Sequence, residues 1–171
     1  MKQAGVWILA IGLLGGFCAV AQPGAITIKA AKKVAGSRDG GNITGGKNID
    51  LRERDLYYEF AVRSMVPQSS ELTVEWVILV ETMKGRLRVV SEGNQAITLK
   101  PGETSLVETP LFALRSESGP KGSTAKGEIE GCAVRVTDSA GNLVGVLYEP
   151  ESRRKQLDEA FHGKVRKRKA L

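Results

Sequence analysis

The chain has 171 residues, and its 25 Lys and Arg residues against 19 Asp and Glu residues give a formal net charge of +6. The excess lies at the ends, because residues 22–150 hold sixteen basic and sixteen acidic side chains and residues 151–171 hold eight basic and three acidic ones. This length predicts one domain with its own core, and the neutral body excludes a nucleic-acid-binding domain that is basic throughout.

The first 21 residues have the pattern of a signal peptide. Lys2 gives a positive start, residues 6–20 form an apolar run, and Ala19-Val20-Ala21 is the small-x-small pattern before a cleavage site. Cleavage before Gln22 leaves an exported protein, periplasmic or extracellular. An uncleaved membrane anchor is the alternative, but the glycine-interrupted run is shorter than the ~20 apolar residues that a spanning helix needs.

The cysteines predict a body without disulfide bonds. Cys18 could mark a lipoprotein signal, but the bulky Phe17 stands where a small residue is expected before an acylated cysteine. After cleavage Cys132 is the only cysteine, so it cannot form an internal disulfide. We expect it to be buried in the core; an intermolecular bridge or a reactive thiol is the alternative.

Short alternating segments predict β-strands through the body of the chain. The first, residues 25–34, is expected to be an edge strand protected by lysines. The strongest pattern is residues 55–81, two alternating runs joined by the turn Pro67–Ser70, which we interpret as the central hairpin. Further strands are predicted at 86–91, 95–100, 104–109, 111–114, 128–137 and 143–148.

Two polar, glycine-rich segments are predicted to be surface loops, at 35–50 and 115–127. Residues 41–47 have the spacing of a phosphate-binding loop, but Asn48 replaces the required Ser or Thr and the strand-loop-helix context is missing. The glycosylation sequon at 42–44 is attributed to chance. Residues 138–142 form a turn whose spacing lacks the alternating ligands of a calcium loop.

The C-terminal end predicts a short helix over residues 151–163 and a disordered basic tail over 164–171. Apolar side chains recur at helical spacing from Leu157 to Phe161, and Gly163 suits a helix C-terminus.

The basic residues of this end are candidates for binding an anionic polymer by salt-sensitive contacts. These residues are Arg153, Arg154, Lys155, Lys164, Arg166, Lys167, Arg168 and Lys169. A solubilising terminus is the alternative. Nucleic acid is disfavoured because no aromatic side chains alternate with the final basic run.

The chain contains few residues of the types that commonly carry out catalysis. His162 is the only histidine, and no Cys/His cluster is present, so we predict no catalytic, cofactor-binding or metal-binding residues. Strand glutamates could pair to form a carboxylate site, from among Glu59, Glu75, Glu81 and Glu130. We therefore expect a protein that is not an enzyme, with a carboxylate-dependent hydrolase of an envelope polymer as the alternative.

The strand pattern resembles the immunoglobulin-like or fibronectin type III-like β-sandwich. Trp76 follows the first central turn and Cys132 lies on a penultimate strand, although Glu130 stands where a tyrosine corner would be. The resemblance implies an all-β antiparallel sandwich of about seven to nine strands over residues 22–150, followed by the short helix.

These observations together predict an exported, non-catalytic binding or structural module of the cell envelope. Its expected partner is a protein or an anionic polymer of the envelope. No stable transmembrane segment is expected after cleavage of the leader.

Overall fold

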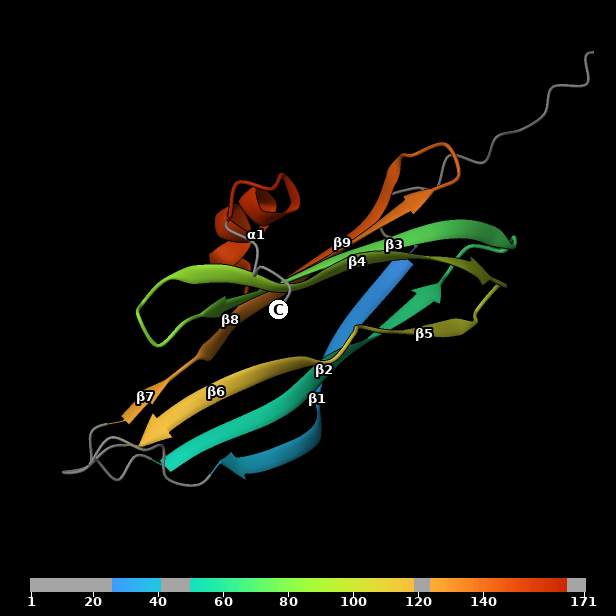
Figure 1. The fold of residues 1–171 in the computed structure, drawn as a ribbon. Helices are drawn as coiled ribbons and strands as arrows, with labels where there is room; N and C mark the ends of the chain where they lie inside the picture. The colour runs from blue at the N-terminus through green and yellow to red at the C-terminus, as the bar shows by residue number, and fades with distance from the viewer. Residues whose placement is uncertain (1–25, 41–49, 119–123, 166–171) are drawn as a thin grey trace, which may run out of the picture.

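The computed structural model describes residues 26–40, 50–118 and 124–165, and shows two antiparallel β-sheets with one short helix on the outside (Figure 1). The predicted leader and most of the basic tail lie outside the described residues. The strands are β1 (Ile26–Gly40), β2 (Asp50–Ser64), β3 (Ser70–Glu81), β4 (Leu87–Leu99), β5 (Thr104–Glu108), β6 (Phe112–Ser118), β7 (Thr124–Lys126), β8 (Glu128–Asp138) and β9 (Leu143–Glu149). The 3₁₀ turn η2 (Glu151–Arg153) and the helix α1 (Arg154–Phe161) follow.

Sheet A has the strand order β1-β2-β6-β7, with β5 also paired to β2, and sheet B has the order β4-β3-β8-β9. β6 pairs with the first half of β2 and β5 with its second half. Pro110, which has no N–H to donate, lies between these two segments. The expected all-β sandwich with a C-terminal helix is confirmed, as is the position of β1 at an edge.

The core lies between the sheets and is built from alternate residues of each strand. Phe60 and Val62 of β2 belong to one cluster with Val74 and Ile78 of sheet B, and all four side chains are fully buried. Burial of apolar surface at about 25 cal/mol per Å² is the main stabilising term for such a layer. The predicted alternation within β2 and β3 therefore identified the inward faces.

The predicted pairing within residues 55–81 is wrong. β2 belongs to sheet A and β3 to sheet B, so the chain between them crosses from one sheet to the other instead of closing a hairpin. Two strands that each have one apolar face can lie next to each other in one sheet or opposite each other in two packed sheets. The sequence alternates between apolar and polar residues in the same way in both cases. The hairpin predicted from the strands at 128–137 and 143–148 is present as β8 and β9.

In the turn of this hairpin, the Asp138 carboxylate is held by hydrogen bonds from residues of the same turn. Asp138 accepts hydrogen bonds from the backbone N–H groups of Ala140 (2.9 Å) and Asn142 (2.8 Å) and from the Asn142 amide (3.0 Å). These bonds, led by that of the Asn142 side chain, lower the pKa of Asp138. Gly141 has φ +82°, as the turn requires.

Parts of both predicted loops are strand, while residues 41–49, with the phosphate-loop spacing and the sequon, and residues 119–123 lie outside the described residues. Residues 35–40 continue β1, and Asp50 already begins β2. Arg115–Ser118 belongs to β6, and Thr124–Lys126 forms β7. These polar strand ends are stabilised by backbone pairing and by ion pairs. They therefore lack the alternation of apolar and polar residues from which a strand can be predicted.

The strands predicted at 86–91 and 95–100 are one strand, β4. Gly93, expected in a turn, lies opposite Trp76 in the ladder, and a Cβ there would be 2.5 Å from the indole ring. The glycine is therefore required because the tryptophan ring covers it. A glycine that leaves room for a cross-strand aromatic ring cannot be told from a turn glycine in one sequence.

Candidate functional site

The C-terminal helix packs on the outer face of sheet B (Figure 1). This contact forms because β3 carries apolar residues on both faces, with Val77 and Leu79 directed away from the main core. Leu157 and Ala160 of α1 are buried against these side chains and Ala133. The predicted helix and its contact through Leu157 are confirmed.

A polar network fixes α1 over this apolar contact. The Asp158 carboxylate accepts hydrogen bonds from the Tyr148 hydroxyl (2.6 Å) and from the Arg135 guanidinium (2.7 Å). The Tyr148 hydrogen bond and the neighbouring arginine lower the pKa of Asp158. The Arg135 guanidinium also lies 4.2 Å from the ring centre of Phe161, a cation–π contact.

Both ends of the helix are fixed as well. Before α1, Arg153 forms an ion pair with Glu130 of β8. At its end Gly163, with φ +69°, donates to the Ala160 carbonyl, and Lys164 donates to the Glu159 carbonyl, both at 2.9 Å. This pair of bonds is a Schellman motif, which satisfies the last carbonyls and sets the direction in which the chain leaves.

The candidate polymer-binding residues divide into three groups. Lys155 and Lys164 are exposed and form no ion pair within the described residues. Arg153 is paired with Glu130, and Arg154 is 3.3 Å from Glu151 and stacks over the Tyr148 ring. The remaining candidates lie outside the described residues: Arg166, Lys167, Arg168 and Lys169.

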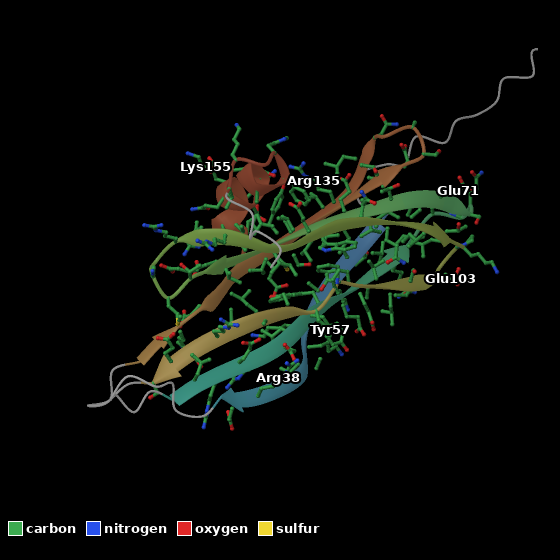
Figure 2. All side chains as sticks on the ribbon, in the orientation of Figure 1. Arg38, Tyr57, Glu71, Glu103, Arg135 and Lys155 are labelled. Atoms are coloured by element: carbon green, nitrogen blue, oxygen red, sulfur yellow. The ribbon has the colours of Figure 1, made fainter. Side chains whose placement is uncertain are left out.

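Figure 2 shows Lys155 on α1, at the outside of the molecule, and Arg38 on β1, on the opposite side of the sandwich. Arg135 lies beneath the helix. The sequence reading missed Arg135 as a helix anchor. The available signal was an arginine within the otherwise apolar run of β8.

The strand glutamates do not converge on one cleft. Glu59 lies on sheet A, 3.6 Å from Lys33, and Glu130 is paired with Arg153. Glu75 and Glu81 both lie on β3, six residues and therefore roughly 20 Å apart. Two of these four carboxylates thus balance nearby cations, and the two on β3 are too distant to act on one bond.

An open cavity of about 150 Å³ lies at one end of the sandwich, between the ends of β3, β4 and β6. It is lined by Val80, Glu81, Thr82, Met83, Arg88, Val90, Ala113, Leu114, Arg115 and Gly127. Small-molecule sites usually measure about 300–1,000 Å³. The cavity suits a single small apolar group and contains one carboxylate, Glu81.

Cys132 is fully buried in the main core, as predicted. Burial, with a smaller contribution from Glu149, raises the pKa of its thiol to about 12. A thiol that stays protonated at neutral pH is a poor nucleophile.

Within the described residues there is no group of three or more His, Cys, Asp or Glu placed to hold a metal ion. None of the helices in those same ranges is long and apolar enough to cross a membrane.

No protein-family model matches the chain, and no curated protein matches it. Among solved structures, the chain is similar to the structural genomics target SoR45, with 10% identity over 73% of this chain and 86% of that one, and a TM-score of 0.38. It is also similar to the putative ApaA protein from Bordetella pertussis, with 9% identity over 72% and 90% of the two chains and a TM-score of 0.35.

A third similarity is to a β-glucuronidase of Bacteroides uniformis, with 10% identity and a TM-score of 0.37. The match covers 74% of this chain but 12% of the glucuronidase. Since all three TM-scores lie below 0.5, these likenesses carry no argument about what the protein does.

Proposed function

We propose that the protein is an exported, non-catalytic binding or structural module of the cell envelope, which contacts an anionic polymer of the envelope through α1 and the basic tail. The observation that carries the proposal is the fixed position of α1. The helix is held by its buried face and by Asp158, and it presents Lys155 and Lys164 outward. The leader pattern of the first 21 residues supports export.

The charge distribution favours this end of the molecule as the binding surface. Asp158 and Glu151, two of the three acidic residues of the C-terminal segment, are already paired with Arg135 and Arg154. The unpaired lysines therefore act as cations toward solvent, next to a tail that adds Arg166, Lys167, Arg168 and Lys169. Repeated contacts with a polyanion release counterions, so affinity rises with the number of basic residues engaged and falls with salt.

The strand arrangement also supports kinship with immunoglobulin-like sandwiches. In those domains strands C′, C, F and G form one sheet, with a tryptophan on C and a cysteine on F. Sheet B has the corresponding order β4-β3-β8-β9, with Trp76 on β3 and Cys132 on β8. Domains with this architecture commonly bind through surfaces and loops, although the architecture does not specify the ligand.

The proposal is tested with purified protein and an immobilised polyanion, polyphosphate, at increasing salt. Deletion of residues 164–171, or Lys155→Gln together with Lys164→Gln, is expected to move elution to lower salt. The matched control is Lys29→Gln with Lys32→Gln, which removes two exposed lysines from β1. Equal elution of the deletion variant and the parent would contradict the proposal, as would the same loss in the control.

A further inference from the structure

The open cavity between the ends of β3, β4 and β6 lies beside two irregularities of sheet B. The pairing of β3 with β4 shifts after Ile78, and its pairing with β8 shifts after Leu79. In each case one residue of the neighbouring strand has no partner on β3, Val90 on β4 and Glu130 on β8. Such bulges bend a strand and redirect its side chains, and they are frequent beside active sites.

The bulge at Val90 directs Arg88 to the inner face of sheet B. Val89 belongs to the cluster that is buried beneath α1 on the outer face, so the residue before it faces inward, opposite Val80 in the ladder. Arg88 and Val80 both line the cavity. Within the described residues, the Arg88 side chain forms no ion pair.

A second inward-facing arginine comes from sheet A. Leu56 and Phe60 of β2 are core residues, so the period of two directs Arg54 to the same face of the strand. Arg54 lies opposite Leu114 of β6, which lines the cavity, and Cβ atoms of opposed residues are roughly 5 Å apart. Arg54 also has no ion-pair partner in the part of the chain that the structure describes. An unpaired arginine on the inner face of a central strand departs from the core pattern, and such departures are expected at functional sites.

The other charged residues of the lining leave these two arginines without a counter-charge. Arg115 pairs with Glu53 at 2.7 Å. Glu81 is the carboxylate of the lining, but it alternates with Val80, and its Oε1 lies 3.4 Å from the position that a Cβ would take on Gly85 in the β3–β4 turn. The Glu81 side chain is therefore directed toward the turn, and the mouth of the cavity is positively charged.

The rest of the lining is largely apolar. Val80, Val90 and Leu114 contribute to its walls, and Met83, 38% exposed, lies at its rim. Gly127 lies where the chain passes from β7 in sheet A to β8 in sheet B (Figure 1), and a Cβ added there would lie 3.2 Å from Cδ1 of Leu114. The absence of a side chain at this position keeps the cavity open. A cavity of about 150 Å³ can hold a molecule of the size of benzene.

We propose that this cavity binds a small organic anion, whose apolar group of about six carbon atoms enters the cavity and whose carboxylate or phosphate lies at the mouth, against Arg88 and Arg54. A guanidinium matches either anion, because its N–H groups can donate two parallel hydrogen bonds to a pair of oxygens. An apolar pocket with a few polar groups that fix the orientation is the usual composition of a small-molecule site. This site does not depend on polymer binding by α1.

The test is an NMR titration of the purified, ¹⁵N-labelled protein with benzoate and with phenyl phosphate, which share the ring and differ in the anion. At least one of the two is expected to shift the amide signals of Leu114 and Gly127 in a saturable way, and the tighter ligand identifies the preferred anion. Acetate lacks the apolar group and benzyl alcohol lacks the charge, so each is expected to bind at least about fivefold more weakly than the preferred probe.

Arg54→Gln together with Arg88→Gln is expected to raise the dissociation constant of the preferred probe about tenfold, because both cations of the mouth are removed. Both side chains are exposed, so the core is not disturbed, and thermal unfolding verifies the fold. The matched control is Lys29→Gln with Arg63→Gln, which removes two exposed cations from the outer face of sheet A and should bind as the parent does.

Three results would overturn the proposal. The first is the absence of a saturable response to both probes. The second is binding of acetate or benzyl alcohol as tightly as the preferred probe, because the site would then not combine charge with an apolar cavity. The third is unchanged binding in the variant of Arg54 and Arg88, or an equal loss in the control.

Discussion

At the scale of single residues, Trp76 and Gly93 form one structural unit. The indole ring is buried, lies over Gly93 and donates from Nε1 to the Ser91 hydroxyl at 3.3 Å. The tryptophan fills the space that the glycine leaves empty, so each residue explains the other. Trp76 is therefore a core residue of the sandwich and not a recognition residue.

Replacement of Trp76 by Ala is expected to lower the free energy of unfolding by about 3–5 kcal/mol, because it leaves a cavity in the core. Chemical denaturation measures this loss. Gly93→Ala in the parent is expected to destabilise by roughly 1–3 kcal/mol through overpacking. The double variant should lose less than the sum, because without the ring the new methyl group has room. Equal midpoints for Trp76→Ala and the parent would refute the assignment.

The Cys132 thiol provides a second test at this scale. With Cys18→Ser, Cys132 is the only thiol, and we expect it not to react with a disulfide reagent at pH 8 until the protein is unfolded. The folded thiol has a pKa of about 12 against an ordinary value of 9.0. The unfolded chain therefore ionises first, so stability is full below pH 9 and falls as the pH rises toward 12. Rapid labelling of the folded protein would contradict this placement.

At the scale of elements, the polar network that adds to the apolar contact of α1 converges on one carboxylate, that of Asp158. Asp158→Asn removes the charge that joins Arg135 to the helix and is expected to cost on the order of 1 kcal/mol, since the side chains are partly exposed. Amide hydrogen exchange of α1 is expected to become faster. Asp138→Asn is the control, because Asp138 lies in the β8–β9 turn, and should leave exchange in α1 unchanged.

The pH dependence of this attachment has a defined sign. The pKa of Asp158 is lowered in the folded state, so its contribution is present above the ordinary value of 3.8 and is lost as the pH falls through the folded value. Exchange in α1 that is indifferent to both the substitution and acid would show that the apolar contact alone holds the helix.

Individual strands of this protein are predictable, but their partners are not. The alternation of β2 and β3 identifies both strands and their inward faces, because burial on one side leaves a period of two. The same alternation is compatible with one sheet or two, and the pairing of β2 with β6 joins residues about 60 positions apart. No local pattern records a contact at that distance along the chain.

The candidate site at the C-terminus was predictable only where it depends on residues close together in the sequence. The basic residues and the helix at the C-terminus are local features, and Leu157 was identified from its spacing. The anchoring of the helix was not, because Arg135, Tyr148 and Asp158 come from three elements. Their role depends on β8 and β9 pairing beneath α1.

At the scale of the whole molecule, the protein is a sandwich of two sheets with α1 on the outer face of sheet B. The apolar core and the helix network hold the fold, and within the described residues the strand glutamates Glu59 and Glu130 serve as partners of nearby cations. Our proposal is that this module binds an envelope polymer without cleaving it. Under this proposal, the residues that bind the polymer are those of α1 and the basic tail.

The most direct measurement is co-sedimentation of residues 22–171 with purified envelope polymer at low and high salt, with analysis of the supernatant for released fragments. We expect the protein to sediment with the polymer at low salt, to be released at high salt and to liberate no fragments. Reproducible release of soluble fragments, or binding that is insensitive to salt, would contradict it.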